Sequence, residues 1–105
     1  MKARRPEQAR ELEDLPNIGR AIAADLRAVG ITRPRQLAEL APLTVYIRLA
    51  GVMAQRHDPC VLYTLLAVRH FLASGQTRPW WRFAAEGRRL LRADAEPQTG
   101  PEGKG

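Results

Sequence analysis

The stretch from residue 12 to residue 31 constrains the fold most, because a Pro-Asn-Ile-Gly turn leads directly into an amphipathic helix that ends at a glycine. The first backbone N–H groups of such a helix have no partner within it, and the turn directs them outward. Unpaired donors at the positive end of a helix dipole attract anions such as DNA phosphate. Arg20 follows Gly19 directly and adds a full positive charge. The stretch therefore predicts an anion-binding hairpin.

The remaining sequence favours an all-α fold. Ala, Leu, Arg and Glu dominate, and no run alternates between apolar and polar residues with a period of two. We expect a compact bundle of five to six helices. Their predicted positions are residues 7 to 14, 18 to 29, 33 to 41, 43 to 50, 59 to 73 and 77 to 92.

Several residues predict where these helices begin and end. Gly30 fits a left-handed residue just after a helix. Thr32 fits the N-cap of the helix predicted at residues 33 to 41. Gly51 is expected to end the helix predicted at residues 43 to 50. Asp58 followed by Pro59 is a strong start signal, since Asp accepts hydrogen bonds from first-turn amides and Pro needs no donor there. The helix after Asp58 carries a wide apolar arc and is expected to be central to the core.

Length and charge limit the number of domains and the kind of partner. A chain of 105 residues can bury one core, which we place in residues 7 to 92. Residues 1 to 6 are expected to be a flexible basic N-terminus, and the polar residues 93 to 105 a disordered tail. The net charge of +6 favours anionic partners. A single cysteine and the lack of any apolar run of about 18 residues predict a cytoplasmic protein without a membrane span.

The predicted DNA contacts fall in two places. The hairpin would contribute the backbone N–H groups of residues 17 to 20 and the Arg20 guanidinium, and all of these would contact the phosphate backbone irrespective of base sequence. Arginines at helical spacings of four, seven and three are predicted to share one face of the last helix. The candidate residues are Pro16, Asn17, Ile18, Gly19, Arg20, Arg27, Arg78, Arg82 and Arg89, with Arg92 completing the helical face.

Each of these assignments has a structural alternative. The hairpin can simply turn the chain with Arg20 in solvent, and the arginine face can be an ordinary solvated surface. Trp80, Trp81 and Phe83 could stack on bases, but aromatic residues beside a proline helix start usually close a small core. A single hairpin reaches few phosphates, so its affinity would be on the order of 10⁻⁴ M or weaker. Useful binding would then need a second site, a homodimer or a protein partner.

No catalytic or metal site is expected. No nucleophile, base and orienting group can be placed together, so neither an enzyme nor a cofactor is predicted. His57, Asp58 and Cys60 are adjacent, but His70 lies about three helical turns further on, too far to complete a zinc site. Cys60 is therefore interpreted as a small buried hydrophobic residue.

Two charged residues lie within apolar arcs. Asp25 and Arg69 each sit on the apolar side of their own helix. Because a buried charge needs a partner, we hypothesise that they pair with each other across the two helices. The alternative is that both lie at the edge of the core and reach water.

The hairpin residues resemble a known motif. Most positions of the helix-hairpin-helix motif are matched, by Leu15, Pro16, Ile18, Gly19, Ala23, Leu26, Gly30 and Ile31. Asn17 stands where the motif usually has its first glycine. Asn is the residue other than glycine that best tolerates the left-handed conformation, so the turn is expected to survive. The resemblance implies a helical fold of the SAM-like type.

Segments beyond the hairpin extend the resemblance over residues 12 to 91. They are Gln36-Leu37-Ala38-Glu39-Leu40, His57-Asp58-Pro59-Cys60-Val61-Leu62 and Pro79-Trp80-Trp81. Together these segments resemble the small bacterial pathogenicity-locus or mitomycin-resistance-type family, and more distantly the C-terminal domain of the TfoX competence regulators. The resemblance implies a compact helical domain built on this hairpin, favours a DNA-binding accessory module and does not imply an enzyme. The alternative is a protein-interaction or regulatory domain with the same fold and no direct contact with DNA.

Overall fold

The computed structural model describes residues 2 to 95, and within them it contains helices but no strands. The five α-helices are α1 (Arg20–Ala28), α2 (Pro34–Glu39), α3 (Pro42–Met53), α4 (Pro59–Ser74) and α5 (Ala84–Ala95). Four short 3-10 helices complete the described chain: η1 (Pro6–Gln8), η2 (Leu12–Asp14), η3 (Ala54–Arg56) and η4 (Trp80–Phe83). The predicted all-α class is confirmed.

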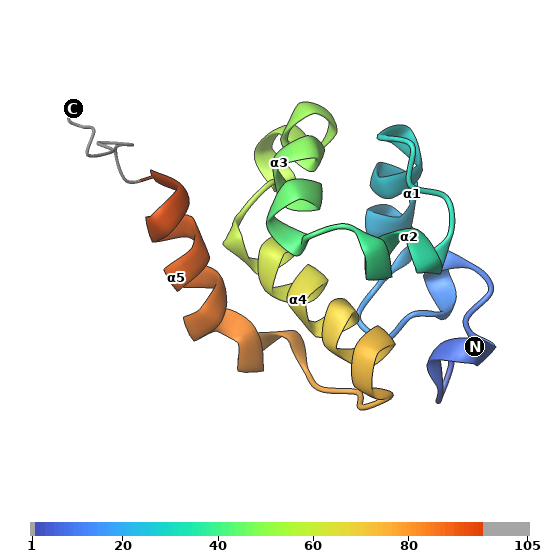
Figure 1. The fold of residues 1–105 in the computed structure, drawn as a ribbon. Coiled ribbons are helices and arrows are strands. Elements are labelled where there is room, and N and C mark those ends of the chain that lie inside the picture. Colours follow the sequence, from blue (N-terminus) through green and yellow to red (C-terminus); the bar gives the residue numbers. More distant parts are fainter. Residues whose placement is uncertain (1, 96–105) are drawn as a thin grey trace.

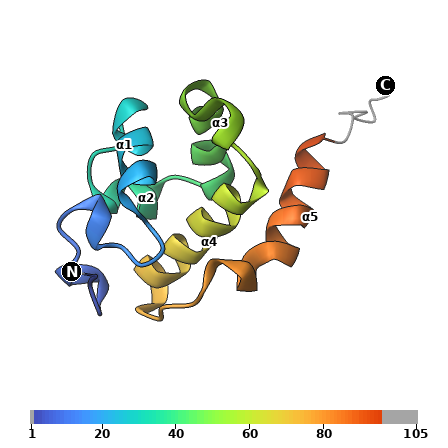
Figure 2. The same cartoon turned by 180° about the vertical axis from the view of Figure 1, so that it is seen from behind.

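Helix α4 is the centre of the molecule. It runs between α1, α2 and α3 on one side and α5 on the other, as both views show (Figures 1 and 2). It packs against α2, α3, α5 and η4. Every residue from 61 to 68 is buried, which fits the wide apolar arc read from the sequence. Such a helix has no solvent face over two turns, so the other elements must cover it from all sides.

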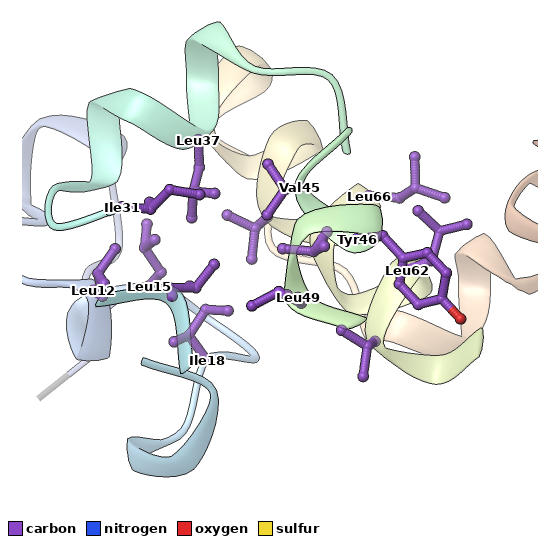
Figure 3. Close-up of a cluster of buried hydrophobic side chains, with 14 of the residues drawn as sticks. Leu12, Leu15, Ile18, Ile31, Leu37, Val45, Tyr46, Leu49, Leu62 and Leu66 are labelled. Carbon is purple, nitrogen blue, oxygen red and sulfur yellow. The ribbon is translucent and has the colours of Figure 1, made fainter. Parts of the chain in front are cut away.

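The hairpin adds its own side chains to this core. Leu12, Leu15 and Ile18 are fully buried. They point toward Ile31 and toward Leu49 of α3 in the close-up of the core (Figure 3). The segment before α1 is therefore held by apolar burial, so the turn that follows Leu15 has a fixed position on the globule.

The strongest boundary signals of the sequence are confirmed. Gly30 is left-handed, with a φ of 90°. The amide of Ile31 donates to the carbonyl of Leu26 at 2.9 Å and that of Gly30 to Arg27 at 3.0 Å, which is the Schellman arrangement. At the start of α4 the Asp58 carboxylate accepts from the amide of Cys60 at 2.8 Å.

The predicted helix over residues 7 to 14 is wrong, because this segment forms two separate 3-10 turns. The Gln8 side-chain oxygen accepts from the backbone N–H of Arg5, and the Asp14 carboxylate accepts from the amides of Arg10 and Glu11. These local bonds cap each short turn and compete with a continuous helix. Leu12 is nevertheless buried, as the apolar pattern required.

Three other predicted boundaries differ from the structure. Thr32 is not an N-cap, since the Gln36 side-chain oxygen accepts from the amides of Thr32 and Arg33 at 2.7 and 2.9 Å. Gly51 does not close its helix, because α3 continues to Met53, whose side chain is buried in the core. The last segment starts with a 3-10 turn, and its α-helix extends to Ala95. The disordered tail was predicted for residues 93 to 105, and this is wrong for residues 93 to 95, which belong to α5. The remainder of the predicted tail, residues 96 to 105, lies outside the described residues.

The hypothesis that Asp25 pairs with Arg69 is wrong. Asp25 is buried, and its carboxylate accepts two hydrogen bonds from Arg56 in η3, at 2.8 and 2.9 Å. Arg69 donates to the carbonyl of Leu40 at 2.8 Å, where α2 has ended and its last carbonyl needs a donor. The buried charge does have a partner, but the partner comes from the turn after α3, a position where the sequence shows no local signal.

Candidate nucleic-acid interface

The hairpin turn, residues 15 to 20, projects the start of α1 toward solvent. Leu15 and Ile18 anchor it in the core, while Gly19 and Arg20 are exposed. Asn17 between them has a φ of 72°, so the predicted left-handed conformation is confirmed. Two buried anchors on either side of a left-handed residue hold the turn in a single shape.

The amides at the start of α1 are available to a ligand. The N–H groups of Gly19, Arg20 and Ala21 have no hydrogen-bond acceptor among residues 2 to 95. No side chain caps the helix, and its first turn contains no acidic residue. All three residues are exposed. Unpaired donors at a helix N-terminus, with no carboxylate in front of them, are suited to bind an anion.

The side chain of Asn17 connects the hairpin turn to the C-terminal part of the molecule. Its Nδ2 group donates to the backbone carbonyl of Arg78 at 3.0 Å. A glycine at position 17 could adopt the turn but could not make this bond. The contact fixes the loop between α4 and η4 beside the hairpin turn without covering the amides of α1.

Lys2 supports the hairpin turn from within, a role that sequence reasoning missed. Its ammonium donates to the carbonyls of Glu13 at 2.8 Å and Leu15 at 2.9 Å, and also to that of Ile18. Partial burial lowers the pKa of this ammonium, and the Asp14 and Glu13 carboxylates oppose that shift. The sequence places Lys2 in a basic N-terminus expected to be flexible, because three backbone carbonyls converging on one side chain leave no sequence signal.

The predicted arginines of the hairpin differ in their availability. Arg20 forms no ion pair with any described residue. Arg27 donates two hydrogen bonds of 2.8 Å to the Glu13 carboxylate, and Glu11 lies 3.6 Å away. The hydrogen bond from Arg27 holds the pKa of Glu13 down at about 2. Arg20 is therefore the free cation at the start of α1, while the charge of Arg27 is largely neutralised.

The arginines of the C-terminal segment do not share one helical face, so that expectation is wrong. Arg78 lies in a loop, where it donates to His70 Nε2 at 3.3 Å and to the Gln76 side-chain oxygen at 3.1 Å. Arg82 belongs to the 3-10 turn η4, and of the four predicted arginines only Arg89 and Arg92 lie in α5. Helical spacing cannot align residues across a loop, a 3-10 turn and an α-helix. The structure brings only Arg78 beside the hairpin turn.

The aromatic residues of η4 divide into a packed pair and an exposed one. Trp80 stacks on Tyr63 of α4 with ring centroids 6.3 Å apart, and Phe83 lies 5.6 Å from His70. These two residues pack against the core, as the structural interpretation expected. The Trp81 side chain is 61% exposed.

The region around Cys60 shows no sign of a metal centre. The prediction that Cys60 is buried is wrong, because the buried part of α4 begins one residue later, at Val61. The His57 ring stacks on Tyr46 at 4.0 Å, and its Nε2 lies 2.7 Å from the backbone carbonyl of that tyrosine. Among residues 2 to 95 no three potential ligands converge on a common point.

None of the helices in the described residues, 2 to 95, has the length and apolar character needed to cross a bilayer.

Comparison with known proteins gives a consistent family. The family model described as "Pathogenicity locus" matches residues 5 to 89. The chain is also 33% identical over 90 residues to the Mitomycin resistance protein McrB of Streptomyces lavendulae, and the match covers 86% of each chain. No solved structure matches.

Proposed function

This chain belongs to the pathogenicity-locus family, and we propose that it is a DNA-binding accessory protein whose hairpin turn contacts backbone phosphates without reading base sequence. The hairpin turn is, in this proposal, a helix-hairpin-helix motif with Asn17 in place of a glycine. The name of the Streptomyces relative refers to mitomycin resistance and states no mechanism, so the proposal rests on the geometry of this chain.

The observation that carries the proposal is the uncapped start of α1. Three consecutive exposed residues, Gly19, Arg20 and Ala21, have amides without an acceptor among the described residues, and the Arg20 side chain forms no ion pair with any of these residues. A phosphate oxygen would accept hydrogen bonds from these donors and would neutralise a free cation. Because such contacts reach only the phosphodiester backbone, they carry no base specificity.

The small size of this donor set predicts weak binding by a single molecule. One turn contacts few phosphates, so its affinity falls at or below the weak end of the non-specific range, on the order of 10⁻⁴ M. A homodimer or a partner that itself binds DNA would supply further contacts. The net charge of +6 adds long-range attraction that depends on ionic strength.

One observation favours a second candidate function, a protein-interaction domain. Ile47 and Val52 on α3 are exposed hydrophobic side chains, 52% and 38% accessible to solvent. Burial of these apolar side chains against a second protein would be favourable. In that case the hairpin turn would only connect η2 to α1, and DNA would have no effect on the protein.

Salt-dependent DNA binding by Arg20→Glu separates the two functions. We expect this variant to bind duplex DNA about tenfold more weakly or worse, because a charged hydrogen bond is replaced by repulsion. Arg48→Glu is the matched control, since Arg48 is exposed on α3 and makes no ion pair with the described residues. It changes the net charge equally but should cost much less affinity.

Fluorescence anisotropy of a labelled duplex across a salt series measures both effects. Wild-type affinity should fall steeply as salt rises, and Arg20→Glu should show a shallower slope because fewer phosphates are neutralised. Equal losses in Arg20→Glu and Arg48→Glu would mean that only net charge matters. Absence of binding to both duplex and single-stranded DNA at low salt would refute the DNA-binding function and favour a protein partner.

A further inference from the structure

The exposed indole of Trp81 is not explained by packing. Its neighbours in η4 are fixed against α4, with Trp80 on Tyr63 and Phe83 near His70. Trp81 touches Trp80 edge to face, with centroids 5.9 Å apart and ring planes at 83°, and otherwise projects outward with 61% of its surface exposed. An aromatic ring that touches a packed neighbour and is mostly exposed to solvent is suited to stack on another ring.

The charge around Trp81 suits a nucleic acid. Arg78 and Arg82 flank it in sequence, and neither forms an ion pair with a carboxylate in the described part of the chain. An apolar protein surface would offer no partner to Arg82, which is exposed and next to Trp81 in the chain. A nucleotide offers both complements, a base for the indole and a phosphate for an arginine.

The position of Trp81 relative to the hairpin turn supports the same ligand. Asn17 holds the backbone of Arg78 at the turn through its 3.0 Å hydrogen bond. Trp81 follows three residues later, so its Cα lies within about 11 Å of that of Arg78. The free amides of α1 and the exposed indole are thus within reach of one strand of DNA.

We propose that Trp81 stacks on an unpaired base, and that the DNA recognised is single-stranded or locally unpaired. This inference rests on the proposed function, because the hairpin turn would hold the backbone of the same strand. A base inside an intact duplex has both faces covered by its neighbours, so Trp81 has no access to it. Stacking is possible with any base, which agrees with contacts that do not read sequence.

Three DNA probes of equal phosphate number test the inference: an oligothymidylate, the same strand without bases, and a duplex. Wild type should bind oligothymidylate about 5- to 150-fold more tightly than the abasic strand, the range expected for one stacked base. Trp81→Leu should remove this preference while leaving duplex binding unchanged. Trp81→Tyr, which keeps an aromatic face, should retain most of it.

The control variant is Ile47→Ala, which removes an exposed apolar side chain of α3 and should bind all three probes as wild type does. Because the Trp81 side chain is mostly in solvent, its variants should unfold at the wild-type urea concentration. Equal wild-type affinity for oligothymidylate and the abasic strand would overturn the inference while leaving the proposed function intact. A preference for bases that survives in Trp81→Leu would also overturn it. Failure to bind any probe would instead refute the proposed function itself.

Discussion

The hairpin side of the molecule and its C-terminal side both pack apolar residues on the core, but they differ in the polar contacts that are added to this packing. On the hairpin side, long-range polar bonds are prominent: the Lys2 ammonium on three carbonyls, the Asn17 amide on Arg78, and the bidentate pair of Asp25 with Arg56. The C-terminal side packs rings and α5 closely on α4. No salt bridge among the described residues involves η4 or α5.

This difference shows how a small protein can fix an exposed turn without blocking it. Polar bonds to the side chain of Asn17 and to the carbonyls of Glu13, Leu15 and Ile18 leave the amides at the start of α1 uncovered. The amides of Gly19, Arg20 and Ala21 at the start of α1 therefore have no acceptor among residues 2 to 95. Close apolar packing does the opposite and removes both partners from solvent, as Trp80 and Phe83 illustrate. Of the three aromatic residues of η4, Trp81 alone is mostly exposed to solvent.

The largest effect is expected from Gly87→Ala, because this change disturbs only the packing of α5 against α4. A Cβ atom at Gly87 would lie 2.3 and 2.4 Å from two ring carbons of Tyr63. That ring is buried and stacked by Trp80, so it has little room to move. We expect a loss of about 3 kcal/mol, the upper end for overpacking. Urea denaturation measures this loss of stability. The folded variant should keep the hairpin contacts of Lys2 and Asp25.

Gly51→Ala is the matched control for this variant. Gly51 lies within α3, and no atom comes within 4 Å of the position that its Cβ would take. Alanine should therefore stabilise the helix by about 0.5–1 kcal/mol. Opposite signs for the two Gly→Ala changes would establish that α5 lies tightly on Tyr63. The same sign for both would contradict the close approach.

The contrast between the two sides also explains which features the sequence could predict. The left-handed Asn17, the C-cap Gly30 and the N-cap Asp58 depend on neighbours within a few residues, and all three were predicted. The partners of Asp25 and Lys2 are brought by the fold from 31 and up to 16 residues away. No local pattern specifies such a contact.

The candidate site follows the same rule. The exposed turn and the free Arg20 were predicted because helix geometry alone leaves the first amides unpaired. The neutralisation of Arg27 and the position of Arg78 were missed, since each depends on tertiary neighbours. The two 3-10 turns before the hairpin were missed because the side chains of Gln8 and Asp14 accept from nearby amides and so cap two short turns in place of one helix.

A moderate effect is expected at Asn17, where the two sides meet. Asn17→Ala forces an unfavourable left-handed alanine and removes the bond to Arg78, and we expect a loss of about 1–2 kcal/mol. Asn17→Gly removes only the bond, because glycine accepts the φ of 72° without strain. Chemical denaturation should therefore rank wild type and the glycine variant close together, with alanine below both. Equal losses in the two variants would show that the bond to Arg78 outweighs the backbone conformation.

The smallest effect on stability is expected from Glu13→Gln and depends on pH. Glu13 lies on the hairpin side, where it accepts two hydrogen bonds from Arg27. Folding lowers the pKa of Glu13 from 4.5 to about 2, chiefly through these bonds. A lowered carboxyl pKa stabilises the fold fully above the unfolded value, and this contribution disappears as the pH falls from about 4.5 to 2. The Tm difference between wild type and Glu13→Gln should shrink over that interval and vanish below it. Glu86→Gln makes the same change in α5, where no ion pair with a described residue exists. The Tm difference between wild type and Glu86→Gln should therefore not follow this acid profile. If it did, the effect of pH on Glu13→Gln would arise from the change in net charge and not from the hydrogen bonds between Glu13 and Arg27.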